Sequence, residues 1–154
     1  MDHEIQDIQL ACFNLGNNLF AVDIMRIKEI LLPQKLSCLP RASNVFEGVI
    51  NLRGSVIPVM DMRKLFGMPT APEGKVGKLL IVTLARQILA VAVDNVLEVI
   101  TVPTKEIKPP LDSTEGIGME HILGVCLSDN RVIMILDIDS LLGHSEYREH
   151  VHSP

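Results

Sequence analysis

The apolar pattern of this 154-residue sequence occurs twice, and this repeat constrains the fold more than any other feature. Placing Glu29 on Glu98 aligns the surrounding apolar residues at an offset of 69, and placing Gly48 on Gly124 continues the alignment at an offset of 76. Each copy ends in the pattern Asp-x-x-x-Leu-x-Gly, which begins at Asp61 in the first copy. We therefore predict an internal duplication. The alternative is that two unrelated β meanders with similar turns slide into register.

The repeated unit consists of short β-branched runs bounded by Gly, Pro, Asn and Asp, which is typical of strands. The predicted strands are Ile8–Leu15, Leu19–Val22, Ile27–Leu31, Val45–Leu52, Val56–Asp61, Leu79–Leu84, Leu89–Val93, Val96–Val102, Ile122–Leu127 and Val132–Asp137. Only Met62–Phe66 and Ile138–Leu142 have a helical pattern. The sequence thus predicts an all-β fold of two five-stranded units. Each unit is too small to bury its apolar face alone, so the two should share a core, and closing each into a small barrel would remove exposed edges.

We expect a single domain over residues 1–154. Its first subdomain is predicted to span about 14–68 and its second about 79–143, and the pattern allows an N-terminal strand to exchange between them. The connection at 69–74 contains two prolines and a glycine, which is typical of a linker. A polar tail follows at 144–154.

Composition disfavours several classes of function. The net charge of −5 and the scattered basic residues disfavour nucleic acid and anionic membranes as partners. Aromatic residues make up only 3% of the chain, so the core must be aliphatic, and we expect Ile50 and Ile135 to be buried in it. Three widely spaced cysteines predict free thiols rather than a disulfide or metal site. The first residues lack the features of a secretory signal, so a cytoplasmic protein with a protein partner is expected.

The segment 48–61 offers the most informative chemistry. Its β-branched runs flank a short polar turn that ends at Gly54, which predicts a hairpin with Arg53 at its tip. The aligned tip of the second copy, 127–130, reads Leu-Ser-Asp-Asn, so packing requires no arginine there. An exposed arginine can bind a partner's carboxylate or carbonyls. The alternatives are a solvated arginine or one paired internally with Glu29.

Candidates for catalysis are few. Asp61 and Asp137 each end a predicted strand just before a helical segment, where a carboxylate accepts hydrogen bonds from free N–H groups. This capping role is favoured over acid–base chemistry for Asp137 and Asp139. A small β-barrel enzyme using His121, Asp137 and Asp139 is the remaining catalytic alternative, and we expect no cofactor.

The motif Gly-Val-Ile-Asn-Leu-Arg-Gly at 48–54, followed by Val-Ile-Pro-Val-Met-Asp at 56–61, resembles the signature of the CheW family of chemotaxis adaptors. The resemblance covers nearly the whole chain, from 13–16 through 107–110 to 132–142. It implies two SH3-like barrels around a common core. It further implies a non-catalytic scaffold that couples chemoreceptors, the methyl-accepting chemotaxis proteins, to the histidine kinase CheA.

The resemblance also implies binding surfaces. In the family, a groove between the lobes receives the receptor's helical hairpin, and the matching residues here include Ile27, Glu29 and Arg53. Comparison of the two copies adds the rest of the hairpin tip, Asn51, Leu52 and Gly54. A kinase-facing segment matches Leu36, Ser37 and Leu39, although Cys38 inside it departs from the usual pattern.

The resemblance implies a cytoplasmic adaptor, held at the inner face of the membrane through receptor arrays and without direct membrane insertion. It should be a monomer in isolation and form arrays with its partners. The alternative is an adaptor of a non-flagellar array that controls surface motility or biofilm formation.

Overall fold

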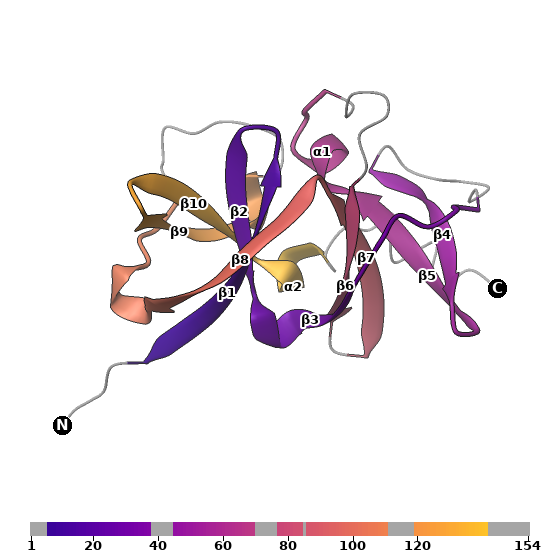
Figure 1. The fold of residues 1–154 in the computed structure, drawn as a ribbon, viewed down its shortest axis with the longest axis horizontal. Coiled ribbons are helices and arrows are strands. Elements are labelled where there is room, and N and C mark those ends of the chain that lie inside the picture. The colour runs from indigo at the N-terminus through magenta and orange to yellow at the C-terminus, as the bar shows by residue number, and fades with distance from the viewer. Residues whose placement is uncertain (1–5, 38–44, 70–76, 85, 111–118, 142–154) are drawn as a thin grey trace.

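The computed structural model describes residues 6–37, 45–69, 77–84, 86–110 and 119–141, which form an all-β fold (Figure 1). The strands are β1 (Asp7–Leu15), β2 (Asn18–Asp23), β3 (Ile27–Leu31), β4 (Phe46–Leu52), β5 (Ser55–Asp61), β6 (Lys78–Leu84), β7 (Gln87–Val93), β8 (Asn95–Pro103), β9 (Ile122–Ser128) and β10 (Arg131–Leu136). The short helices are α1 (Met62–Leu65) and α2 (Ile138–Leu141), and the 3-10 turns are η1 (Ile24–Arg26), η2 (Thr104–Glu106) and η3 (Met119–His121). Each predicted strand is confirmed to within two residues at either end. No helix in this described part of the chain is long and apolar enough to cross a membrane.

The strands form two five-stranded sheets, and each sheet takes strands from both halves of the chain. Strand order is β3-β6-β7-β5-β4 in one sheet and β8-β1-β2-β10-β9 in the other. Figure 1 shows the two groups as lobes lying side by side. We call the lobe built from β3 to β7 lobe 1, and the lobe built from β1, β2 and β8 to β10 lobe 2.

This arrangement differs from the predicted subdomains, 14–68 and 79–143. Those bounds would place each lobe in one consecutive half of the chain, whereas β1 and β2 pack in lobe 2 and β6 and β7 pack in lobe 1. The exchange therefore involves two strands from each half rather than one N-terminal strand. Apolar periodicity identifies strands and their faces, but it does not specify which distant strand each one pairs with.

The duplication extends to the pairing register. The parallel pair β5 and β7 places Val59 opposite Ala90, and the parallel pair β10 and β2 places Ile135 opposite Ala21. These two pairs are equivalent at the offsets of 76 and 69 found in the sequence. An isolated bridge beside each sheet edge is also repeated, Ser37 with Val49 and Lys108 with Val125. Two copies of one folding unit, with β1–β2 and β6–β7 exchanged, explain this equivalence, which unrelated meanders would not produce.

Steric crowding explains why both copies have a glycine at the equivalent positions 48 and 124. A Cβ built on Gly48 would lie 2.4 Å from the carbonyl oxygen of Ser37, and one built on Gly124 would lie 2.7 Å from that of Lys108. Both distances are too short for a side chain. The glycines therefore let the segment before each hairpin lie directly against it.

The core is aliphatic and shared between the lobes. The largest cluster of buried side chains draws on β1, β2, β6 and β7, and it includes the stacked rings of Phe13 and Phe20, whose centroids are 5.7 Å apart. Each lobe also has a smaller cluster of its own. Ile50 lies in the cluster of lobe 1 and Ile135 in that of lobe 2, and both are buried, which confirms the core prediction. Burial of this shared cluster requires both lobes.

Candidate functional site

The hairpin between β4 and β5 holds Arg53 in an unusual backbone conformation. Leu52 pairs with Ser55, so Arg53 and Gly54 form a two-residue turn, and both have positive φ, +50° and +89°. Two positive φ values define a type I′ turn, which suits Gly, Asn and Asp far better than arginine. The Asn51 Oδ1 atom accepts a hydrogen bond from the Gly54 N–H at 2.9 Å and stabilises the turn. The hairpin prediction is confirmed, with Arg53 at its tip.

The Arg53 guanidinium pairs with the Glu29 carboxylate. Glu29 lies on β3 and Arg53 follows β4, and these strands are the two edges of the sheet in lobe 1. The ion pair therefore joins the edges, consistent with closure of the sheet into a barrel. The Glu29 side chain is 27% exposed, but that of Arg53 is 66% exposed. Internal pairing thus leaves most of Arg53 open to a partner, and exposed ion pairs are weak enough to exchange.

The other residues predicted to bind a receptor differ in accessibility. Asn51 and Gly54 are exposed at the tip of the hairpin. Ile27 is half-buried against the shared core, and Leu52 is half-buried against the cluster of lobe 1. The structure thus brings Glu29 together with the hairpin tip, whereas Ile27 and Leu52 serve mainly in packing.

The segment predicted to face a kinase lies beside lobe 1. Ser37 exchanges two backbone hydrogen bonds with Val49, at 2.8 and 2.9 Å. Leu36 is half-buried against lobe 1 and lines a cavity of about 240 Å³ together with Glu47. Leu39 lies outside the described residues, as does Cys38.

The thiols of Cys12 and Cys126 are free and buried, and burial raises the pKa of Cys12 to about 11.

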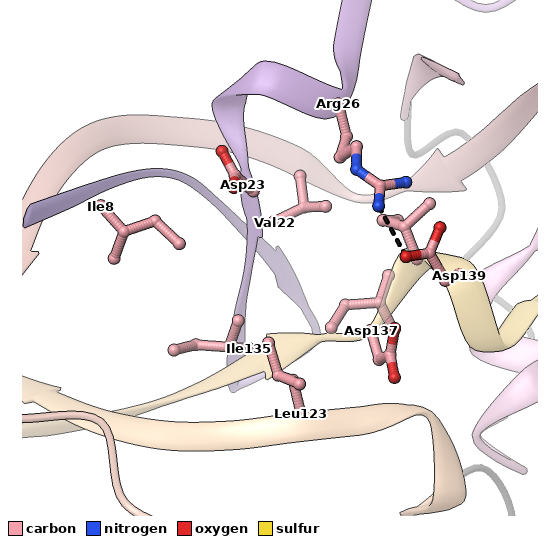
Figure 2. A pocket seen from close by; sticks show the side chains of 10 residues that line it. Ile8, Val22, Asp23, Arg26, Leu123, Ile135, Asp137 and Asp139 are labelled. Atoms are coloured by element: carbon pink, nitrogen blue, oxygen red, sulfur yellow. Dashed lines mark hydrogen bonds and ion pairs between the residues drawn. The ribbon is translucent and has the colours of Figure 1, made fainter. Parts of the chain in front are cut away.

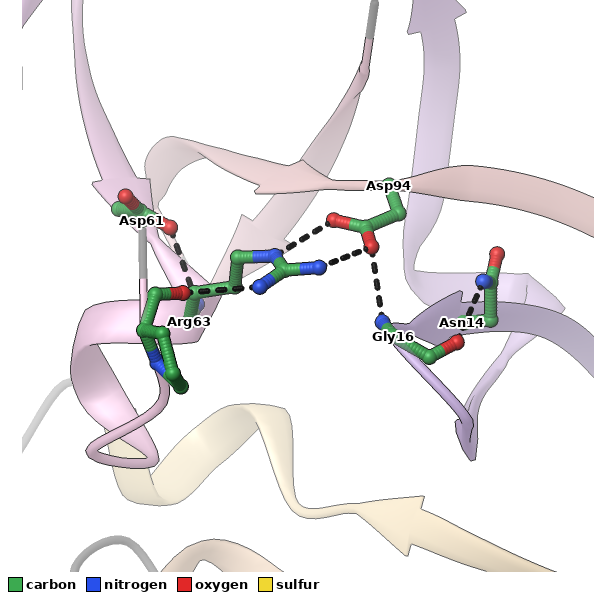
Figure 3. A network of polar contacts seen from close by, with 6 residues as sticks. Asn14, Gly16, Asp61, Arg63 and Asp94 are labelled. Carbon is green, nitrogen blue, oxygen red and sulfur yellow. Dashed lines mark hydrogen bonds and ion pairs between the residues drawn. The ribbon is translucent and has the colours of Figure 1, made fainter. Parts of the chain in front are cut away.

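A buried ion pair that sequence reasoning missed joins the two lobes (Figure 3). The Arg63 Nε and Nη2 atoms donate to the two carboxylate oxygens of Asp94 at 2.9 and 2.7 Å. One of these oxygens also accepts from the Gly16 N–H at 2.8 Å, and Arg63 Nη1 donates to the carbonyl of Pro69 at 2.8 Å. Arg63 belongs to α1 of lobe 1, Gly16 to a hairpin of lobe 2, and Asp94 to the crossover between the lobes. This network therefore fixes the position of one lobe on the other.

The second crossover carries an ion pair with the charges reversed (Figure 2). Arg26 in η1 donates to Asp139 in α2 at 2.6 Å, and Asp139 is equivalent to Arg63 in the repeat. The hydrogen bond from Arg26 holds the pKa of Asp139 below its ordinary value. Both residues line a pocket of about 180 Å³ whose walls include Ile8 and Leu123. This pair is more exposed than the pair of Arg63 and Asp94.

The three residues of the alternative catalytic site, His121, Asp137 and Asp139, each bond to other parts of the fold. The buried His121 places Nδ1 2.6 Å from the Ser140 hydroxyl, which donates to the Asp137 carbonyl at 2.7 Å. The Asp137 N–H donates in turn to the carbonyl of His121 at 2.7 Å, and Asp139 holds Arg26. These contacts tie α2 to η3 rather than aim acid and base groups at a common point. Within the described ranges, no three His, Cys, Asp or Glu side chains are placed to hold a metal ion.

Asp61 caps α1, as the sequence predicts. Its Oδ1 atom accepts from the Arg63 N–H at 2.9 Å. Burial raises the pKa of Asp61 from its ordinary 3.8 to about 6, and a hydrogen bond with the Glu47 carboxyl is the second largest cause of this rise. Glu47 also lies 3.2 Å from the Lys64 ammonium. The cap in lobe 1 is therefore a titrating group near neutral pH.

The fold and these contacts define a duplicated, two-lobed all-β domain. Residues 9–146 match the model of the CheW-like domain. The chain therefore belongs to the CheW-like domain family, which confirms the resemblance seen in the sequence.

Similar proteins match over most of their own length. The chemotaxis protein CheW of Treponema pallidum is 30% identical over 148 residues, 94% of this chain and 87% of that protein. Protein FrzA of Myxococcus xanthus is 28% identical over 142 residues, 91% of this chain and 88% of that protein. The crystal structure of the scaffolding protein TtCheW from Thermoanaerobacter tengcongensis matches with a TM-score of 0.78 and 30% identity over 88% of each chain.

Proposed function

We propose that this chain is a non-catalytic adaptor of bacterial chemotaxis, coupling the cytoplasmic tip of chemoreceptors to the regulatory domain of the histidine kinase CheA. The family match supports an adaptor, and the similar TtCheW is described as a scaffolding protein. The adaptor would act in the cytoplasm, held at the inner face of the membrane through receptor arrays and monomeric when isolated.

The observation that carries the receptor contact is the exposed arginine in a strained turn. The equivalent turn of lobe 2 contains Asp129 and Asn130, residue types that tolerate positive φ, whereas lobe 1 has Arg53 at +50°. An unfavourable residue type at an exposed turn supports a binding role rather than a folding role. An amphipathic helix laid along β3 and the hairpin would present a carboxylate to Arg53 and a basic group to Glu29.

Binding of a soluble receptor-tip fragment to the full chain tests this proposal. Arg53→Ala should weaken binding at least about tenfold, because hydrogen bonds to charged groups contribute about 1.5–3 kcal/mol and 1.4 kcal/mol is a factor of ten. Arg86→Ala is the matched control, since Arg86 is also exposed beside a hairpin turn. Unchanged affinity in a folded Arg53→Ala variant would remove Arg53 from the site. Equal losses in both variants would indicate only general electrostatic attraction.

On the kinase side, we propose that Leu36, Ser37 and Leu39 contribute to the contact with CheA. The cavity lined by Leu36 supports this, because it could receive an apolar side chain of the kinase.

A second candidate function is that of an adaptor in a non-flagellar array that controls surface motility or biofilm formation. The similarity to protein FrzA of Myxococcus xanthus, beside that to the CheW proteins, supports this candidate. Co-purification of the native partners would separate the two.

A further inference from the structure

The Glu–Arg pair that joins the sheet edges of lobe 1 has a counterpart in lobe 2. Glu98 on β8 is equivalent to Glu29, and its carboxylate lies 3.8 Å from the Arg131 guanidinium. Arg131 begins β10, just after the turn, so it is displaced by two residues from the position equivalent to Arg53. Strands β8 and β9 are the edges of this sheet, so the pair links an edge strand to the opposite hairpin here too. Position and charge recur although the arginine comes from another place in the sequence.

The exposed aliphatic side chains beside the two pairs also recur. Ile30 follows Glu29 and is 47% exposed, and its equivalent Val99 is 49% exposed. Val56 on the hairpin of lobe 1 is 72% exposed, and its equivalent Val132 is 52% exposed. Exposed aliphatic residues at matched positions add nothing to core burial. Such groups are typical of protein-binding surfaces.

The surface around the ion pair of lobe 2 is more apolar than the surface around the ion pair of lobe 1. Exposed Leu97 stands at the position of Lys28, and exposed Leu127 at that of Asn51. A cavity of about 330 Å³ opens beside Leu127 and Val132. It is large enough to take an aliphatic side chain from a partner.

We infer that lobe 2 carries a second docking surface for an amphipathic helix, with a mainly aliphatic contact stripe and a carboxylate placed opposite Arg131. This inference rests on the proposed function, because lobe 1 supplies the template. The surface consists of Leu97, Glu98, Val99, Leu127, Arg131 and Val132.

The chemistry of the surface suits such a helix. Consecutive side chains of a strand point to opposite faces, so Glu98 and Val99 lie on opposite sides of β8. Because β8 is the end strand of its sheet, a helix laid along that edge would reach both. The side chains of Arg131 and Glu98 are 48% and 57% exposed, so their mutual pairing is weak and Arg131 can exchange to a partner's carboxylate. Aliphatic anchors would supply affinity and Arg131 the orientation.

A nitrogen-15 NMR titration of the full chain with a helical-hairpin fragment of a chemoreceptor tip tests the inference. Two groups of backbone amides should shift, one around 28–30 and 51–56 and the other around 97–99 and 127–132. Arg53→Glu should abolish the first group alone, and Arg131→Glu the second alone. Arg86→Glu is the control and should leave both groups in place. Thermal unfolding checks that each variant is folded, and Arg131→Gln replaces Arg131→Glu if the latter is not.

Each outcome is decisive. Shifts confined to lobe 1, or second-group shifts that persist in the Arg131 variant, overturn the second surface and leave the proposed function intact. If Arg131→Glu abolishes the second group of shifts while Arg53→Glu changes neither group, the proposed role of Arg53 is removed and the second surface is supported. The exchanged variant Glu98→Arg with Arg131→Glu keeps an ion pair within lobe 2. Restored shifts in that variant would indicate a purely structural role, whereas docking through Arg131 predicts that they stay absent.

Discussion

Asp94→Ala removes the carboxylate that holds the two lobes in register. The hydrogen bonds lost include two from the Arg63 guanidinium and one from the Gly16 N–H. The Arg63 side chain is only 10% exposed, so its charge remains largely inside the protein. The Arg63 guanidinium still donates to the carbonyl of Pro69, which is neutral. The variant therefore contains a buried positive charge that has lost its hydrogen-bonded carboxylate.

The expected cost follows from that geometry. Removing one partner of a buried ion pair costs about 3–5 kcal/mol, and the lost bond from Gly16 adds about 1 kcal/mol. We expect the free energy of unfolding to fall by about 4–6 kcal/mol, a large share of the about 5–15 kcal/mol typical of whole domains. With a urea m-value of about 2 kcal/mol/M, the midpoint of unfolding should fall by roughly 2–3 M.

The reversed pair supplies the control. In Asp139→Ala the lost partner is Arg26, and these two side chains are 62% and 33% exposed, so the loss should stay below about 1 kcal/mol. Urea unfolding followed by circular dichroism measures both variants under the same conditions. Equal losses in the two variants, or a loss below about 1 kcal/mol for Asp94→Ala, would refute the reasoning.

Two further predictions concern stability. Ile50→Ala and Ile135→Ala should each cost about 2–5 kcal/mol in the same assay, because both side chains are buried, and near-neutral values would contradict their place in the core. Asp61 has a pKa raised to about 6 from 3.8, so the folded state binds its proton more tightly than the unfolded chain. Its contribution to stability is therefore fully present below about pH 4 and is lost as the pH rises through 6. Asp61→Asn keeps a capping oxygen and should flatten this loss between pH 4 and 7, whereas an unchanged pH slope would exclude Asp61 as its source.

The elements of this fold were predictable because their signals are local. Alternating β-branched residues and turn residues located the strands, and the position of Asp61 between a strand and a helical segment predicted its cap. The repeat predicted two equivalent sheets. It did not reveal the exchange of strands, because pairing between distant strands depends on which faces meet in the shared core.

Features of the site that join distant residues were harder to foresee. Arg63 and Asp94 are 31 residues apart, and neither stands out in the sequence. Arg53 was identified from its turn, but its pairing with Glu29 stood only as one of two alternatives. The pair in lobe 2 was missed because the alignment set Asp129 against Arg53. An arginine two positions later, together with the aligned Glu98, was the signal that could have found it.

The exchange of strands has a consequence for how the chain is made. Strands β1 and β2 are synthesised first, but the strands they pair with, β8 and β10, are synthesised only after all five strands of lobe 1. Lobe 1 has all its strands once Val93 has emerged, whereas lobe 2 must await residues near 136. Domains usually fold from the N-terminus during synthesis, but here the strands made first belong to the lobe finished last. Until then the side chains of β1 and β2 that belong to the cluster of lobe 2 lack their later partners, although those in the shared cluster can already pack against β6 and β7.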